Sequence, residues 1–163
     1  MNTKLLAGIV AAALCGQASA VVWTFNDPMS GLQEAPPNAS PGSGSIAGTY
    51  DDVTNLLSYN LSFTGLIAPT SAAHLHSAPP GTAGGVQIAA AGFPLGVTSG
   101  AYGNSHTLTA LQETQIMSGL WYFNIHSSAF PGGEIRGQIT LVPAPGAIVL
   151  MGLGLLGTVR RRR

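Results

Sequence analysis

The chain has a single cysteine and very little fixed positive charge. Cys15 lies in an apolar run near the N-terminus, so no disulfide can form within the chain. Of its 6 lysine and arginine residues, all but one are Lys4 and the terminal run Arg160–Arg163. Residues 21–142, between the two ends, contain no basic patch to neutralise phosphates, which argues against a nucleic-acid partner.

The exception is Arg136, in the stretch "WYFNIHSSAFPGGEIRGQITLV" at residues 121–142. It stands close to Glu134 and His126 in the sequence. All 6 acidic side chains fall within residues 21–142, so Arg136 is the only permanent cation in an acidic segment. This isolation raises the question of what Arg136 does.

Residues 1–20 have the pattern of a secretory signal peptide. Lys4 precedes the apolar run "LLAGIVAAALCG", and Ala18 and Ala20 occupy the small-residue positions of a cleavage site. We therefore expect signal peptidase to remove residues 1–20 and the chain to be exported.

Residues 143–163 form a second targeting segment, "PAPGAIVLMGLGLLGTVRRRR". As a helix, the uncharged run at 146–159 would span roughly 21 Å, short of the ~30 Å hydrocarbon core, and residues 142–145 bring it nearer, so it is a marginal span. The arginines that follow favour a cytoplasmic C-terminus. We expect a transmembrane sorting helix. The residues that define this segment are Pro143, Pro145, Arg160, Arg161, Arg162 and Arg163.

The order of these parts resembles the PEP-CTERM sorting signal of Gram-negative bacteria. The resemblance implies recognition by an exosortase, cleavage near Pro143 to Pro145, a transient stay in the inner membrane, and delivery to the cell surface or extracellular matrix. Ala144 stands where that family usually has glutamate, and Gly146 where a serine or threonine is common. A plain C-terminal membrane anchor is the alternative.

Residues 21–142 suit one domain with one core. Strand-like segments are "VVWTF", "SIAGTY", "LLSYNLSFTGL", "SAAHLH" and "VQIAA", with an irregular, proline-rich stretch at 26–44. Alternating segments on either side of "PGG" predict a hairpin. One helix is expected in "LTALQETQIMSG", capped by Thr107 or Thr109 and ended by Gly119. The predicted fold is an all-β antiparallel sandwich, Greek-key or immunoglobulin/superoxide-dismutase-like, with one short helix.

Four segments of this domain resemble the CHRD domain found in chordin and in many secreted bacterial proteins. They are "MSGLQEAPP", "GSGSIAGTYDDVTNLLSYNLSFTGL", "AAHLHSAPPGTAGG" and "GLWYFNIHSSAFPGGEIRGQI". The resemblance implies an extracellular binding or structural module and transfers no catalytic residue. We therefore expect no enzyme activity.

The histidines suggest a metal site. His74 and His76 lie two apart, so on a strand both rings project from one face, about 6.6 Å apart along the chain. His126 on another strand would add a third ligand for Cu or Zn, with His106 or Glu134 beyond it. The alternative is that these histidines only donate hydrogen bonds to loop carbonyls.

Arg136 also has two interpretations. A guanidinium with five donors can tie strand ends to turn carbonyls and pair with Glu134 or Glu34. Alternatively, Arg136 binds the carboxylate of a ligand such as a sugar acid, and Asn124 and Glu134 contribute to the same binding site. The polar residues of this face are equally compatible with a solvent-exposed sheet face.

Two functions follow from these patterns. The favoured one is a non-enzymatic, exported module at the cell surface or in the matrix, which binds exopolysaccharide or a surface protein. The alternative is a metal-binding sandwich, a Cu/Zn redox protein that uses His74, His76 and His126.

Overall fold

The structure is a computed structural model that describes residues 21–145. The expected signal peptide and the apolar helix from residue 146 onward lie outside these residues. The elements, in chain order, are β1 (Val22–Ser30), η1 (Gly31–Gln33), β2 (Ser43–Asp51), β3 (Leu56–Thr64), β4 (Thr70–Ser77), β5 (Gly85–Ala89), β6 (Gly100–Thr107), α1 (Ala110–Met117), β7 (Trp121–Ser127), β8 (Ile135–Gln138) and β9 (Val142–Pro143).

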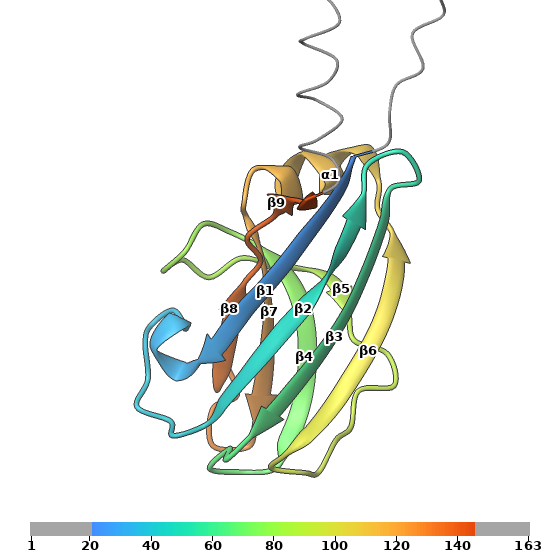
Figure 1. The fold of residues 1–163 in the computed structure, drawn as a ribbon. Coiled ribbons are helices and arrows are strands. Elements are labelled where there is room, and N and C mark those ends of the chain that lie inside the picture. Colours follow the sequence, from blue (N-terminus) through green and yellow to red (C-terminus); the bar gives the residue numbers. More distant parts are fainter. Residues whose placement is uncertain (1–20, 146–163) are drawn as a thin grey trace, which may run out of the picture.

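All strands belong to one antiparallel sheet, in the order β5-β4-β7-β8-β1-β2-β3-β6, with β9 added to β1. The sheet curls so that β1, β2, β3 and β6 face β4, β7 and β8 (Figure 1). The two halves join where Ser30 of β1 pairs with Arg136 of β8. The predicted antiparallel β class with one short helix is confirmed.

The predicted sandwich differs from the structure in one respect. A sandwich has two separate sheets, whereas here the Ser30–Arg136 pairing makes one continuous, half-barrel sheet. The predicted hairpin is present, because β7 pairs with β8 from Tyr122–Gln138 to Ile125–Ile135.

The core fills the inside of the curl. Alternate residues of β3 point inward, and Tyr59 meets Phe123 of β7 with ring centroids 5.8 Å apart. Leu57, Phe123 and Ile125 have no exposed surface. Each such side chain contributes about 1.5–3 kcal/mol by leaving water. Without a disulfide, this core and the strand ladders hold the domain.

β1 is longer than the sequence predicts. The sequence places its end near Phe25, but β1 continues through Pro28 to Ser30, paired with β2 throughout. Pro28 is tolerated because neither β8 nor β9 pairs with β1 at that residue, so no ladder donor is needed on that edge. β6 was not predicted, because Gly100–Thr107 offers only Tyr102 as a large apolar residue.

The helix follows its predicted signals. Thr109 is the N-cap, and it forms a capping box with Gln112. Gly119, with φ of +70°, follows the last turn. Within residues 21–145, no helix combines the length and apolar character required to cross a membrane.

Both ends of the described chain lie at the same end of the domain. Trp23 of β1 pairs with Pro143 of β9, and the Ala144 amide donates to the Val22 carbonyl at 2.9 Å. Pro143 of the sorting segment therefore belongs to the sheet, next to the start of β1 (Figure 1).

Candidate metal centre

The candidate site lies on the outer face of β4, β7 and β8. Register places His74 beside Asn124, and Asn124 beside Arg136, across three neighbouring strands. The alternation in the sequence suits a solvated polar face, but all residues of β7 are buried. Asn124 is only 2% exposed and Arg136 1%. The polar face is covered, so its groups must find partners within the protein.

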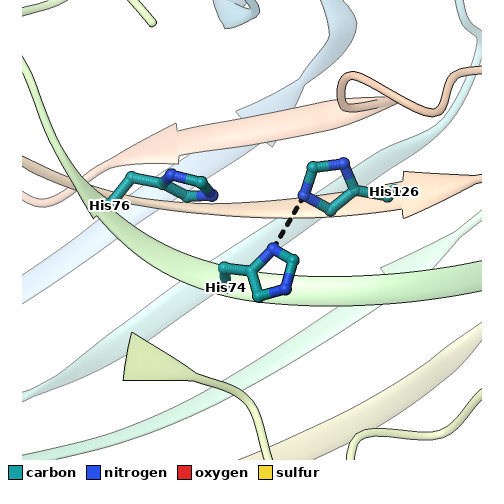
Figure 2. A group of neighbouring side chains, drawn as sticks. All are labelled: His74, His76 and His126. Atoms are coloured by element: carbon teal, nitrogen blue, oxygen red, sulfur yellow. Dashed lines mark hydrogen bonds between the residues drawn. The ribbon is translucent and has the colours of Figure 1, made fainter. Parts of the chain in front are cut away.

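Three histidines converge on this face. His74 and His76 come from β4 and His126 from β7, as Figure 2 shows. One ring nitrogen from each lies within 4.8 Å of the other two. The His74 Nδ1 and His126 Nε2 atoms are 3.0 Å apart. His106 and Glu134, the further ligands that the sequence suggested, do not belong to this group.

Backbone carbonyls fix which nitrogens carry protons. His76 Nδ1 lies 2.9 Å from the Gly84 carbonyl, and His126 Nδ1 lies 2.9 Å from the Pro131 carbonyl. A carbonyl only accepts, so each Nδ1 must donate, which leaves the lone pair of each neutral ring on Nε2. His126 Nε2 accepts from His74 Nδ1, whereas His76 Nε2 is buried with no hydrogen-bond partner.

Burial keeps all three rings neutral. Desolvation is the largest cause that lowers the pKa of His74, His76 and His126, and the neighbouring histidines lower the pKa of His74 and His126 further. Neutral imidazole is the form that binds a metal. Because His74 Nδ1 donates to His126 Nε2, this atom would offer a lone pair to a metal only after its proton moves to the other ring nitrogen of His74.

The geometry is close to what a metal requires. Metal–nitrogen bonds of ~2.0–2.1 Å in a tetrahedral arrangement separate ligand nitrogens by about 3.3 Å. Ring movements of about an ångström would reach that arrangement from the observed one. The carbonyls of Gly84 and Pro131 already play the part of outer partners that orient ligating histidines.

The hydrogen bonds of Arg136 explain its presence in a segment with no other lysine or arginine. Its Nη1 donates to the Thr82 carbonyl at 2.8 Å, and its Nη2 donates to the Pro79 carbonyl at 3.2 Å and to Gln138 Oε1 at 2.7 Å. The predicted role of tying turn carbonyls is the one observed. Of the two acids that the sequence suggested as partners of Arg136, Glu34 is the one whose charge acts on it, and no hydrogen bond joins Arg136 to Glu134 within residues 21–145.

Glu134 points to a different part of the fold. Its Oε1 accepts from Ser40 Oγ and from the Ile67 amide, both at 2.6 Å. Its backbone carbonyl accepts from Asn38 Nδ2 at 3.1 Å. Although two residues apart, Glu134 and Arg136 therefore stabilise different loops.

Arg136 is linked to the histidines through a loop that covers the site. We call residues 78–84 the roof loop. Arg136 holds its middle at Pro79 and Thr82, and the Gly84 amide donates to Tyr122 Oη at 2.9 Å. The Arg136 Cζ lies 3.4 Å from the Tyr122 ring centroid, and the His76 ring stacks on Tyr122 at 5.0 Å. Arg136 thus supports the loop whose Gly84 carbonyl orients His76.

The sequence offered hydrogen bonds to loop carbonyls as the alternative role of the histidines, and His76 and His126 make such bonds to Gly84 and Pro131. It did not predict which carbonyls accept, because a carbonyl leaves no trace in residue identity, and it missed Tyr122 as a support of His76. It named Glu34 as a candidate partner of Arg136 but did not predict the burial of Glu34. This side chain is 5% exposed, and desolvation raises its pKa to about 7 despite the opposing charge of Arg136.

The structure is one curled antiparallel sheet with a group of three histidines on its outer face. A CHRD domain model matches residues 25–139, and a PEP-CTERM protein-sorting motif matches residues 141–163. The chain therefore belongs to the CHRD domain family. The sorting motif indicates export and processing by an exosortase, as in Gram-negative bacteria. No curated protein and no solved structure matches the chain.

Proposed function

We propose that the chain is an exported module that binds one Cu or Zn ion through His74, His76 and His126. The observation that carries this proposal is the buried, unpartnered Nε2 of His76, which lies beside two other ring nitrogens. A buried acceptor without a partner costs roughly 1–3 kcal/mol, and a bound metal would remove that cost.

Three neutral imidazoles favour copper or zinc over magnesium or calcium, which prefer oxygen ligands. Three protein ligands also leave a further position for water or another molecule. We propose that the metal serves a binding or structural role and that the module is not an enzyme, since the resemblance to the CHRD family carries no catalytic residue.

A second proposed activity is binding of exopolysaccharide or a protein at the cell surface or in the matrix. It is favoured by a cleft at the end of the domain away from α1, lined by Glu34 and several prolines. The side chains that line the cleft differ from the three histidines, and the two sites share only Pro131, whose carbonyl accepts from His126. Each proposed activity can therefore be tested without the other.

Metal analysis of the purified exported protein tests the first proposal. After EDTA treatment and exposure to Cu(II) or Zn(II), we expect about one ion per chain and a higher melting temperature. His76→Ala should reduce the affinity at least tenfold.

His106→Gln provides the matched control. His106 lies on β6 near the Tyr59 hydroxyl, outside the three-histidine group, so its loss should leave metal binding unchanged. A wild-type protein that retains no metal, or an equal loss in His106→Gln, would contradict the proposal.

A further inference from the structure

A cleft of about 340 Å³ lies between the segment that follows η1 and the loop between β7 and β8. Glu34, Pro36 and Pro37 line one side of the cleft, and Phe130, Pro131 and Gly132 line the other. Its volume is at the lower end of the range for small-molecule sites. The metal site does not use any of these side chains.

Glu34 is the only charged residue that lines this cleft. Only 5% of its surface is exposed, and its Oε1 atom has no hydrogen-bond partner. This oxygen is covered in the structure, so a ligand in the cleft meets Glu34 through the small part of its side chain that is exposed.

The walls of the cleft are fixed before any ligand arrives. Asn38 Nδ2 donates across it to the Gly133 carbonyl at 3.2 Å, and the Asn38 amide donates to the Gly31 carbonyl at 3.0 Å. On the opposite wall, the Pro131 carbonyl accepts from His126. A site that needs no ordering on binding retains more of its interaction energy.

The charges around the cleft select against ionic ligands. It contains no lysine, arginine or histidine to bind an anion. A cation is disfavoured as well, because the Arg136 charge already acts on Glu34. A neutral molecule that carries several hydroxyl donors meets both conditions.

The remaining surface also suits such a molecule. Phe130 and the three prolines offer flat apolar faces, and the C–H faces of a sugar ring pack on surfaces of this kind. We propose that this cleft binds one unit of a neutral saccharide, with hydroxyls donating to Glu34 and the ring packed against Phe130. This inference rests on the proposed polysaccharide binding and says where on the domain it occurs. It does not require a bound metal.

The test uses NMR titration of the exported protein in EDTA, so the outcome does not depend on metal. The probes are neutral oligosaccharides of glucose, galactose, mannose and N-acetylglucosamine, an amine-bearing glucosamine oligomer and an acidic uronate oligomer. We expect at least one neutral probe to shift the amide signals of Gly132 and Gly133, and neither ionic probe to bind more tightly.

Gly132→Leu should abolish this binding without disturbing the fold. Gly132 lines the cleft, and a Cβ there meets no atom within 4 Å, so a leucine fits without a clash at the cleft wall. Glu34→Gln should weaken binding at least fivefold, because an amide oxygen accepts less strongly than a carboxylate. Glu113→Gln, which changes an acid on α1 away from the cleft, is the matched control and should bind normally.

Three results would overturn the inference. They are no binding of any neutral probe, tighter binding of an ionic probe, and normal binding by Gly132→Leu. In the last case polysaccharide binding would stand and only the cleft would be wrong. Peptide binding at Gly132 without any sugar binding would assign the cleft to a protein partner instead.

Discussion

At the scale of single residues, Arg136 shows why a chain so poor in charge keeps one buried cation. Only a planar group with several donors can serve the carbonyls of Pro79 and Thr82 and the Gln138 oxygen while it stacks on Tyr122. A lysine at this position offers a single point charge and cannot meet all of these partners. Arg136 therefore acts as a structural and positioning residue.

Arg136→Gln should lower the free energy of unfolding by about 2–4 kcal/mol, because buried carbonyls lose their donors. Thermal melting of the metal-free protein measures this. Arg136→Lys should recover only part of the loss. If Arg136→Gln melts at the wild-type temperature, the contacts with the roof loop are unimportant for stability.

Glu34 should give a characteristic pH dependence. Its pKa is about 7 in the folded protein against 4.5 ordinarily, mainly because burial disfavours the charged form. The folded state therefore binds this proton more tightly than the unfolded state does. The contribution of Glu34 to the free energy of unfolding declines as pH rises from about 4.5 to about 7.

The difference between wild type and Glu34→Gln isolates this effect, since the other titrating groups are common to both proteins. Relative to the variant, the wild type should lose about 1–3 kcal/mol of stability between pH 5 and pH 8. If the difference in melting temperature between the two proteins is the same at every pH in this range, Glu34 does not titrate in this way.

At the scale of elements, the roof loop connects the lone cation to the metal ligands. Gly84 is essential to this connection because its carbonyl accepts from His76 while its amide donates to Tyr122. A Cβ at Gly84 would overlap the Ser77 carbonyl oxygen, so any larger residue must displace this end of the loop.

Gly84→Ala should therefore weaken Cu or Zn binding roughly tenfold, although residue 84 contributes no side-chain ligand. Its control is Gly85→Ala, since a Cβ at Gly85 meets nothing within 4 Å. Competition titrations against a chelator compare the two. Equal metal affinities of the two variants would show that the roof loop does not affect metal binding.

The sequence predicted elements well where one local signal dominates. Thr109 and Gly119 marked the ends of α1, and the alternation at 121–126 marked β7. It failed at β6, whose glycines and short polar residues carry no pattern, and at Pro28, whose acceptance depends on a distant strand edge. Strand faces and residue spacing predicted that the three histidines lie together. They could not predict that this face is buried, because loops distant in sequence cover it.

At the scale of the whole molecule, the sorting segment begins inside the folded sheet. Pro143 pairs with Trp23, and the Ala144 amide bonds to Val22. The Pro-x-Pro stretch thus starts as a strand of the domain.

Replacing Pro143 and Pro145 together by alanine should leave an unprocessed precursor in the membrane fraction if the Pro-x-Pro stretch is recognised by the exosortase. Immunoblots of membrane and medium fractions measure this. Unchanged release of the double variant would argue for a plain membrane anchor.

The two ends of the described chain lie together at one end of the domain, since Trp23 pairs with Pro143 and the Ala144 amide donates to the Val22 carbonyl. From there β1 runs away toward η1 (Figure 1). At ~3.3 Å per residue, the 9 residues of β1 cover roughly 30 Å. If the C-terminal segment holds the chain in a membrane, the cleft lined by Glu34 lies about the length of β1 away from the point of attachment.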